Sequence, residues 1–389
     1  MTQTLETTVL IVGAGPVGLA LAAELRRRGV DALLVDRQAA GANTSRAAVI
    51  HARTLEVLEP LGVTGTLLDQ GLKVPDFRVR DRDRLLLEVS FDEIPSAYRF
   101  GLMCPQDRTE LVLQARLLEL GGAVERGCEL SSFTTTPDGV EAELVSAEGT
   151  RRVRARWLIG CDGMHSRVRE QAGIAFIGDS YEESFVLADV HMSWPLAREE
   201  VSLFLSPSGL VVVAPLPGDR YRIVATVPRE EQAPQQPSAA FMQALLDARG
   251  PSEQPARIQD VVWSSRFHIQ HRVAETPRKG RVLLCGDAAH VHSPAGGQGM
   301  NTGIQDAMSL ASALAETLAD SDETRLDVWA RARHRVAEDV VAMTDRMTRM
   351  ATLHSSFRRG VRNVLLGWAG QVPFVRQKLA TQLAELGAR

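Results

Sequence analysis

Three glycine-rich segments carry residue types that can hold a phosphate or the edge of a flat ring. The first, GAGPVG at residues 13–18, follows an apolar, β-branched run that ends at Val12. Gly13 allows a tight turn, Gly15 lets the backbone approach a pyrophosphate, and Gly18 lets the next helix pack closely on the strand. Pro16 opens that helix, whose free N–H groups favour an anionic phosphate.

An acidic residue follows this motif at a distance that suits a nucleotide. A second apolar run, residues 32–35, ends in Asp36, eighteen residues after Gly18. A carboxylate there can accept hydrogen bonds from ribose hydroxyls, and Arg37 beside it is a further candidate contact. Strand, turn, helix, strand and acid together predict dinucleotide binding, although they do not separate FAD from NAD. The alternative is a tight turn that binds nothing.

The second and third segments also follow apolar runs. The second, residues 160–169, contains Asp162, although an Asp-Gly pair after a strand is commonly only a turn. In the third, residues 286–303, Asp287 suits a polyol hydroxyl, and the glycines let N–H groups close on a ring edge. A helix predicted to start near Gly303 would stabilise negative charge on a reduced flavin. The candidate cofactor contacts of this segment are Gly286, Asp287, Pro294, Gly297, Gly299, Met300 and Asn301.

With these motifs in this order, the chain resembles the class A flavoprotein monooxygenases with the p-hydroxybenzoate hydroxylase fold. The resemblance covers nearly the whole chain and rests on residues 13–18, 161–163 and 286–287. It implies that FAD is the cofactor, with NADPH or NADH as a transient reductant near the middle motif. Two shorter matches, around residues 45–56 and 105–110, imply that Arg46 reaches the cofactor and that Gln106 touches the FAD ribose.

The resemblance also implies a reaction. NAD(P)H would reduce the flavin, dioxygen would give a C4a-hydroperoxide, and an electron-rich phenolic or polyketide-type aromatic substrate would be hydroxylated. Arg46 and Pro294 are the expected catalytic contacts at the flavin, and Arg220 or Arg222 could face the substrate from one side of a strand. Epoxidation, Baeyer–Villiger insertion and oxidative decarboxylation by the same fold stay open, as does a FAD-binding ligand sensor without turnover.

The relatives that this chain resembles most include actinobacterial polyketide hydroxylases of antibiotic biosynthesis. Many of those carry a C-terminal thioredoxin-like domain, which we do not expect in this chain. The expected architecture is α/β, with an antiparallel-sheet domain inserted into a Rossmann-like domain that ends in helices. The predicted FAD-binding domain comprises residues 1–73, 98–178 and 272–389, and the predicted substrate-binding domain comprises residues 74–97 and 179–271.

Composition and charge restrict the classes of partner that the chain is expected to bind. A formal net charge of −4 over 389 residues gives no strong positive field, which argues against nucleic acid as a partner. The four cysteines are widely spaced, and His290 and His292 lack a third ligand, so neither disulfides nor a metal is expected. No signal peptide or long apolar run is visible, so the sequence predicts a cytoplasmic protein without stable membrane insertion. It leaves monomer and homodimer open.

Overall fold

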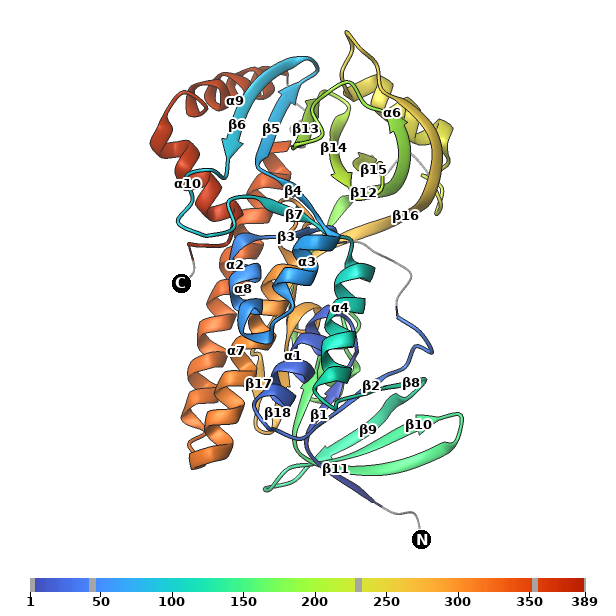
Figure 1. Ribbon diagram of the computed structural model, residues 1–389, viewed down its shortest axis with the longest axis vertical. Helices are drawn as coiled ribbons and strands as arrows, with labels where there is room; N and C mark the ends of the chain where they lie inside the picture. The colour runs from blue at the N-terminus through green and yellow to red at the C-terminus, as the bar shows by residue number, and fades with distance from the viewer. Residues whose placement is uncertain (1–3, 42–46, 228–232, 352–355, 388–389) are drawn as a thin grey trace.

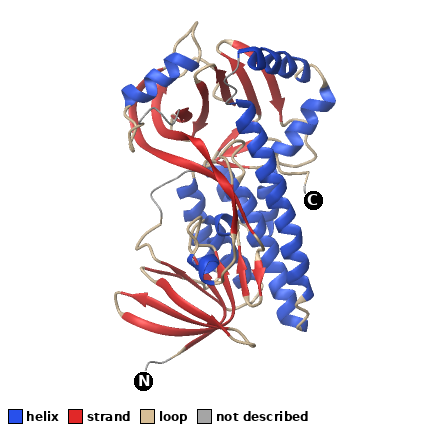
Figure 2. Ribbon diagram, turned by 180° about the vertical axis from the view of Figure 1, so that it is seen from behind, coloured by secondary structure: helices blue, strands red, loops and turns tan. Residues whose placement is uncertain are grey.

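The computed structural model describes residues 4–41, 47–227, 233–351 and 356–387. Two large sheets form its two ends (Figure 1), and a small sheet lies between them. The long strands β12 and β16 run from the upper sheet toward the lower part, as Figure 2 shows from behind. The small sheet consists of β3 (Val49–Ile50), β7 (Gly101–Met103) and β4 (Leu72–Val74).

The first sheet is parallel at its centre, because crossover connections join its strands, as α1 joins β1 to β2. The parallel strands follow the order β18-β11-β1-β2-β8. Alternate residues of the second half of β1 enter two different cores, so both faces of the strand are covered there and residues 9–12 are all apolar. The strands are β1 (Leu5–Val12), β2 (Ala32–Asp36), β8 (Val124–Arg126), β9 (Glu129–Thr135), β10 (Val140–Ser146), β11 (Gly149–Gly160), β17 (Arg278–Lys279) and β18 (Val282–Leu284).

Helices cover one face of this sheet and continue beyond it. Residues of α1, α4 and α7 pack with β1 and β11 in one apolar core. The long helix α8 runs beside α7 (Figure 1). The helices are α1 (Pro16–Arg27), α2 (Ala52–Leu58), α3 (Thr64–Gln70), α4 (Gln106–Glu119), α5 (Arg167–Gln171), α7 (Gly299–Asp320) and α8 (Thr324–Ala351), with short 3-10 turns η1 (Glu59–Leu61) and η2 (Gly286–Ala288).

The second sheet has the order β19-β16-β12-β15-β14-β13-β5-β6. Its neighbours are antiparallel except for β13 and β5. Helix α6 (Ala239–Arg249) packs on one face, whereas α9 (Ser356–Ala369) and α10 (Pro373–Leu383) contact the edge strand β6. The strands are β5 (Asp76–Asp81), β6 (Arg84–Ser90), β12 (Phe176–Ser193), β13 (Glu200–Ser206), β14 (Gly209–Leu216), β15 (Arg220–Val227), β16 (Arg257–Ala274) and β19 (His290–Val291).

The predicted α/β fold class is confirmed, and one predicted boundary is wrong. Helix α7 begins at Gly299 rather than near Gly303, because the Thr302 N–H already donates to the Gln298 carbonyl at 2.9 Å. We propose the domain boundaries predicted above. Helices α9 and α10, which that prediction assigns to the FAD-binding domain, contact β6 of the second sheet. Among the described residues, no helix has both the length and the apolar composition needed to cross a bilayer.

Candidate cofactor and substrate site

The first glycine motif is fixed by its contacts at two positions and open at a third. Gly13 has φ +103°, and a Cβ atom there would lie 2.3 Å from the Cys161 carbonyl oxygen. A Cβ on Gly18 would lie 1.9 Å from the Gly13 oxygen. By contrast, nothing lies within 4 Å of a Cβ on Gly15, which precedes Pro16 at the start of α1. The motif is therefore tightly packed against the protein at Gly13 and Gly18, and has free space next to Gly15.

Asp36, the last residue of β2, stabilises this turn by accepting a hydrogen bond from its backbone. Its Oδ2 accepts a hydrogen bond from the Ala14 N–H at 2.6 Å, and its Oδ1 accepts one from the Gln38 N–H at 2.8 Å. Arg126 approaches Oδ2 to 3.7 Å, and Arg37 is exposed next to Asp36. A carboxylate has about four acceptor positions, so these contacts leave room for a ligand hydroxyl.

The second motif follows β11 and lies against the first through the Gly13–Cys161 contact. Asp162 accepts hydrogen bonds from the Ser166 hydroxyl at 2.6 Å and from the Val168 N–H at 3.1 Å. Ser166 in turn caps α5 by accepting from the Arg169 N–H, as its position predicts. Burial raises the pKa of Asp162, although these hydrogen bonds oppose the shift. The carboxylate thus orders the backbone after the strand.

The third motif meets the first on the other side of α1. A Cβ on Gly286, which has φ +60°, would lie 2.9 Å from a methyl group of Val17. A Cβ on Gly303 in α7 would lie 2.7 Å from the same methyl group. Asp287 is exposed within the η2 turn that follows β18. The three motifs therefore share the carboxyl edge of neighbouring parallel strands, where ligands of such sheets bind.

Hydrogen bonds of Asn301, which is completely buried, hold the loop 294–299 in place. The Asn301 amide donates to the Gly297 carbonyl at 2.8 Å and to the Val49 carbonyl at 2.9 Å, and its oxygen accepts from the His51 N–H at 2.8 Å. The His51 ring contacts the Gly296 carbonyl at 2.7 Å. Burial lowers the pKa of His51 to about 4, so its ring is neutral at pH 7.

The remaining loop residues divide into exposed and buried ones. Pro294 is exposed, and its carbonyl accepts from the Gly297 N–H at 2.9 Å, which closes a turn. Gly297 has φ +67°, which favours glycine, and a Cβ there would lie 2.2 Å from Val49. Met300, in the first turn of α7, is buried in the core, whereas Gly299 is half-buried. The loop is therefore held at fixed points, with Pro294 on its outer side.

Gln106 begins α4 and is joined to the chain next to Arg46. Its N–H donates to the Ala47 carbonyl at 3.1 Å, and its side-chain amide donates to Glu110 at 2.9 Å. Arg46 itself lies outside the described residues. Its predicted role therefore stays a prediction.

The strand predicted to face the substrate presents two arginines on one side. Arg222 is buried, and its guanidinium donates to both Asp189 oxygens, at 2.7 and 2.9 Å, from the neighbouring strand β12. Arg220 donates to the Pro217 carbonyl at 3.3 Å. Tyr221 faces the opposite way and packs near Trp194 beside α6. Alternation thus places Arg220 and Arg222 together, but the charge of Arg222 is already paired.

The face of the sheet that bears Arg222 also carries an apolar cluster. Phe185 and Phe267 stack there with ring centroids 6.0 Å apart, and Val224 packs in the same cluster. Leu383 of α10 belongs to this cluster too, and its carbonyl accepts from the Gln298 side chain at 3.2 Å. Leu383 therefore joins this apolar face to the loop 294–299, because it packs in the cluster and accepts a hydrogen bond from Gln298 of the loop.

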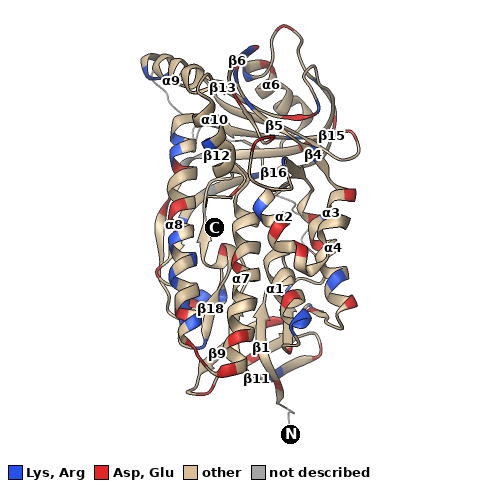
Figure 3. Ribbon diagram, turned by 60° about the vertical axis from the view of Figure 1, so that its left-hand side comes forward, with Lys and Arg blue, Asp and Glu red and all other residues tan. Residues whose placement is uncertain are grey.

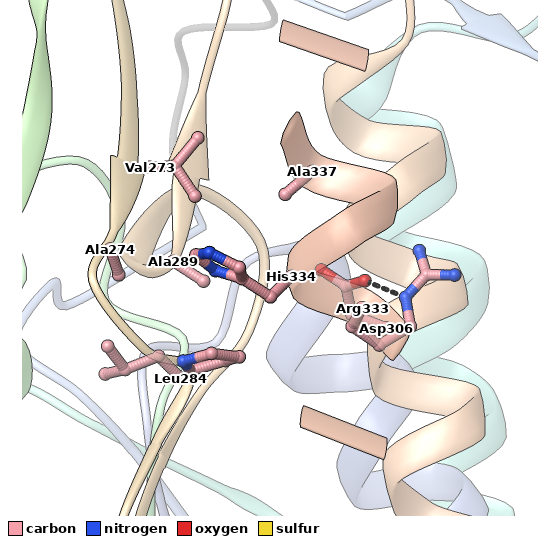
Figure 4. Close-up of a pocket in the computed structure, with 9 residues that line it drawn as sticks. Val273, Ala274, Leu284, Ala289, Asp306, Arg333, His334 and Ala337 are labelled. Atoms are coloured by element: carbon pink, nitrogen blue, oxygen red, sulfur yellow. Dashed lines mark hydrogen bonds and ion pairs between the residues drawn. The ribbon is translucent and has the colours of Figure 1, made fainter. Parts of the chain in front are cut away.

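A buried ionic group lies behind the third motif. Asp306 of α7 contacts the His290 ring at 2.6 Å and pairs with Arg333 of α8. Its Oδ2 also accepts from the Gly286 N–H at 3.4 Å. Burial disfavours the charge, but Arg333 and His290 hold the pKa of Asp306 below its ordinary value. Figure 4 shows this pair at the edge of a small, mostly apolar pocket, into which His334 extends.

Glu385 is a second acidic group near α7. It accepts hydrogen bonds from the Gln305 amide and, at 3.4 Å, from the Thr302 hydroxyl. Burial raises its pKa to about 8, although Gln305 and Arg333 oppose the shift. The folded protein therefore binds a proton here that the unfolded chain releases above its ordinary pKa of 4.5.

This proton linkage predicts a pH dependence of stability. The stabilisation from protonated Glu385 is complete below about pH 4.5 and is lost as the pH rises toward 8. Glu385→Gln cannot ionise, so its stability relative to the parent should rise between pH 5 and pH 8. Urea unfolding midpoints across this range measure the effect, with the exposed Glu119→Gln as control. Parallel curves for parent and Glu385→Gln would rule the linkage out.

Comparison with known proteins identifies the family. A family model described as "FAD binding domain" matches residues 6–344. The chain is 39% identical over 352 residues to the 6-methylpretetramide 4-monooxygenase of Streptomyces rimosus. The chain belongs to the class A flavin monooxygenases. The match covers 90% of this chain and 63% of that relative, so the chain spans less than two thirds of its length.

A second relative and a solved structure agree with this family, and a further structure shares the fold. The pentachlorophenol 4-monooxygenase of Sphingobium chlorophenolicum is 33% identical, over 89% of this chain and 65% of its own length. The structure of OxyS, an anhydrotetracycline hydroxylase from Streptomyces rimosus, has a TM-score of 0.83 at 31% identity, covering 98% of this chain and 76% of that one. The p-nitrophenol 4-monooxygenase PnpA from Pseudomonas putida DLL-E4 shares the fold, with a TM-score of 0.89 at 23% identity over 100% and 99% of the two chains.

The cofactor of this monooxygenase family is FAD, and the site geometry fits it. Gly15 is open where a pyrophosphate would approach, and the first turn of α1 presents backbone N–H groups there. Near the predicted ring site, His292 Nε2 and Gln298 Oε1 are buried without a hydrogen-bond partner among the described residues. Buried polar atoms are normally paired, so these two atoms can serve a ligand.

Two substitutions separate the closed and open sides of the first motif. Gly18→Ala should destabilise the fold by about 1–3 kcal/mol, because its methyl group overlaps the Gly13 oxygen. Gly15→Ala should leave stability nearly unchanged and weaken FAD at least ~10-fold, since its methyl group enters the pyrophosphate's space. Urea unfolding without FAD and titration of flavin fluorescence measure the two effects. Unchanged FAD affinity in Gly15→Ala would remove Gly15 from the cofactor site.

Proposed function

We propose that this protein consumes NADPH or NADH and dioxygen to hydroxylate an electron-rich aromatic ring, of phenolic or polyketide type, on bound FAD. One observation carries the proposal. Three glycine motifs meet at the carboxyl edge of the parallel sheet, and the loop of the third is connected to an apolar sheet face with stacked Phe185 and Phe267. Such a face suits a flat, apolar substrate next to a flat cofactor.

We assign each part of FAD to the residues that would bind it. Gly13, Gly15, Pro16 and Gly18, with Asp36 and Arg37, would hold the ADP half of FAD, and Gln106 its ribose. Gly286 and Asp287 would hold the ribityl chain, and Gly297, Gly299, Met300 and Asn301 the ring. Asp162 would order the backbone near the nicotinamide, and Arg46 would reach the flavin. When bound, FAD supplies hydride acceptance and the activation of dioxygen.

Positioning and exclusion of water are the tasks left to the protein. Asn301 and neutral His51 fix the loop 294–299, so that Pro294 would be held in a constant position toward bound FAD. The apolar face around Phe185 would exclude water from the site and orient the substrate ring. Arg220 or Arg222 would contact a phenolic oxygen at the rim of this face.

The names of the relatives support an aromatic substrate without selecting one. They refer to 6-methylpretetramide, to pentachlorophenol and, for a solved structure, to anhydrotetracycline. A cytoplasmic location is part of the proposal, because the reductant NAD(P)H is an intracellular metabolite.

The decisive experiment measures NADPH and NADH oxidation by the FAD-loaded protein with a panel of phenols and polycyclic aromatics. Hydrogen peroxide is recorded in parallel, and each product is analysed by mass. Stimulated oxidation with a gain of one oxygen atom at a ring carbon is the expected result. Oxygen gained as an epoxide or lactone, or loss of carbon dioxide, would instead assign an epoxidase, a Baeyer–Villiger enzyme or a decarboxylating monooxygenase. Tight binding of an aromatic without any NAD(P)H oxidation would indicate a ligand sensor.

A further inference from the structure

Helix α9 turns its apolar side away from the protein. Phe357, Val361, Val364, Leu365 and Trp368 are all exposed and recur at helical spacing, so they form one stripe about 100° wide. Phe357 is 78% exposed, Val364 70% and Trp368 63%. Exposed apolar residues scattered singly are normal, but a contiguous stripe of this size indicates a surface that binds something.

The opposite side of α9 is the polar one, and it is anchored. The Asn363 amide donates to Asp81 of β5 at 3.0 Å. Arg362 is buried, and its guanidinium donates to the Met350 carbonyl at 3.0 Å. Leu366 carries an apolar contact from this side into the second sheet. These bonds fix the rotation of the helix about its axis, so the apolar stripe is held outward. Helix α9 itself lies on the rim of the molecule (Figure 1).

The charges around the stripe select the kind of partner. The segment 356–383 contains five basic residues and no Asp or Glu, in a chain whose net charge is −4. Arg358 is exposed one position from Phe357, and Phe374 at the start of α10 is 72% exposed. Figure 3 shows α9 at the upper rim, away from the acidic residues on the helices below. The basic residues are Arg358, Arg359, Arg362, Arg376 and Lys378.

We propose that α9 binds the surface of a membrane that contains anionic lipids. Trp and Phe on the apolar side and arginine at its border are the features of helices that lie in the headgroup region, and each nearby cation is attracted by an anionic leaflet. A second copy of this chain fits less well, because a symmetric contact would bring the same cations together. The helix lies on the membrane and does not cross it.

Vesicle binding by the FAD-loaded, 389-residue protein tests this proposal. The protein should sediment with vesicles of phosphatidylcholine and phosphatidylglycerol, far less with phosphatidylcholine alone, and less at high salt. The triple variant Phe357→Ser, Val364→Ser, Trp368→Ser should bind at least ~10-fold more weakly. Arg358→Glu should weaken binding to anionic vesicles only. FAD content and urea unfolding show that each variant is folded.

A matched control replaces three exposed apolar residues elsewhere, Leu111, Leu118 and Val328 on α4 and α8, by serine. This control should bind vesicles like the parent. Equal loss in both triple variants, or binding that ignores lipid charge, would overturn the proposal. So would absence of vesicle binding, whether or not sedimentation shows a dimer that the α9 variant abolishes. None of these outcomes depends on turnover, so they leave the proposed function untouched.

Discussion

Asp306→Ala is expected to lower the free energy of unfolding by about 3–5 kcal/mol, because it removes one partner of a buried ionic group. Asp306 is 2% exposed and is shared by Arg333, His290 and the Gly286 N–H. Without it, the Arg333 guanidinium keeps a hydrogen bond to the Thr302 carbonyl at 3.3 Å but loses its buried carboxylate partner. Loss of the contact to Gly286 should also weaken FAD, since that residue opens the third motif.

Two further variants serve as controls for the loss of stability in Asp306→Ala. Asp306→Asn keeps the shape and part of the hydrogen bonding, so its loss should be intermediate. Asp320→Ala removes an exposed carboxylate from the other end of the same helix, where the ion pair with Arg325 is in water, and should change little. Urea unfolding at a fixed FAD concentration compares the three. A loss for Asp306→Ala no larger than that for Asp320→Ala would show that the buried group does not stabilise the fold.

The glycine motifs could be predicted from the sequence because their constraint is local. Gly13 and Gly286 need positive φ angles, and Gly18 has no space for a Cβ atom. Such demands leave glycine at fixed spacing after an apolar strand, which is visible without any knowledge of the rest of the fold. The parallel sheet follows from the same strand-turn-helix pattern.

Contacts between distant segments could not be predicted in this way. Asn301 and His51 are 250 residues apart, and their hydrogen bond depends on how β3 meets the loop. Alternation could place Arg220 and Arg222 on one face, but the pairing with Asp189 depends on the register of β12 and β15. In α9, periodicity shows an apolar side but not its direction, which Asn363 and Arg362 set by their tertiary contacts.

The ion pair of Arg222 and Asp189 allows the stability and function of the substrate face to be separated. Both side chains are buried, at 3% and 6% exposure, and two hydrogen bonds join them. Asp189→Ala should therefore cost about 3–5 kcal/mol of unfolding free energy, because Arg222 keeps a buried charge without its carboxylate. The double variant Asp189→Leu, Arg222→Met should recover most of this loss, since apolar side chains of similar size can replace a buried pair.

The folded double variant then tests whether Arg222 acts on the substrate. If its guanidinium contacts a phenolic oxygen, the double variant should bind FAD normally but show a substrate-stimulated NAD(P)H oxidation reduced at least ~10-fold in kcat/KM, the loss expected for one charged hydrogen bond. Arg220→Met, on the same face but less buried, is the matched comparison. Unchanged kcat/KM in the double variant would assign the pair to stability alone and leave Arg220 as the arginine that can face the substrate.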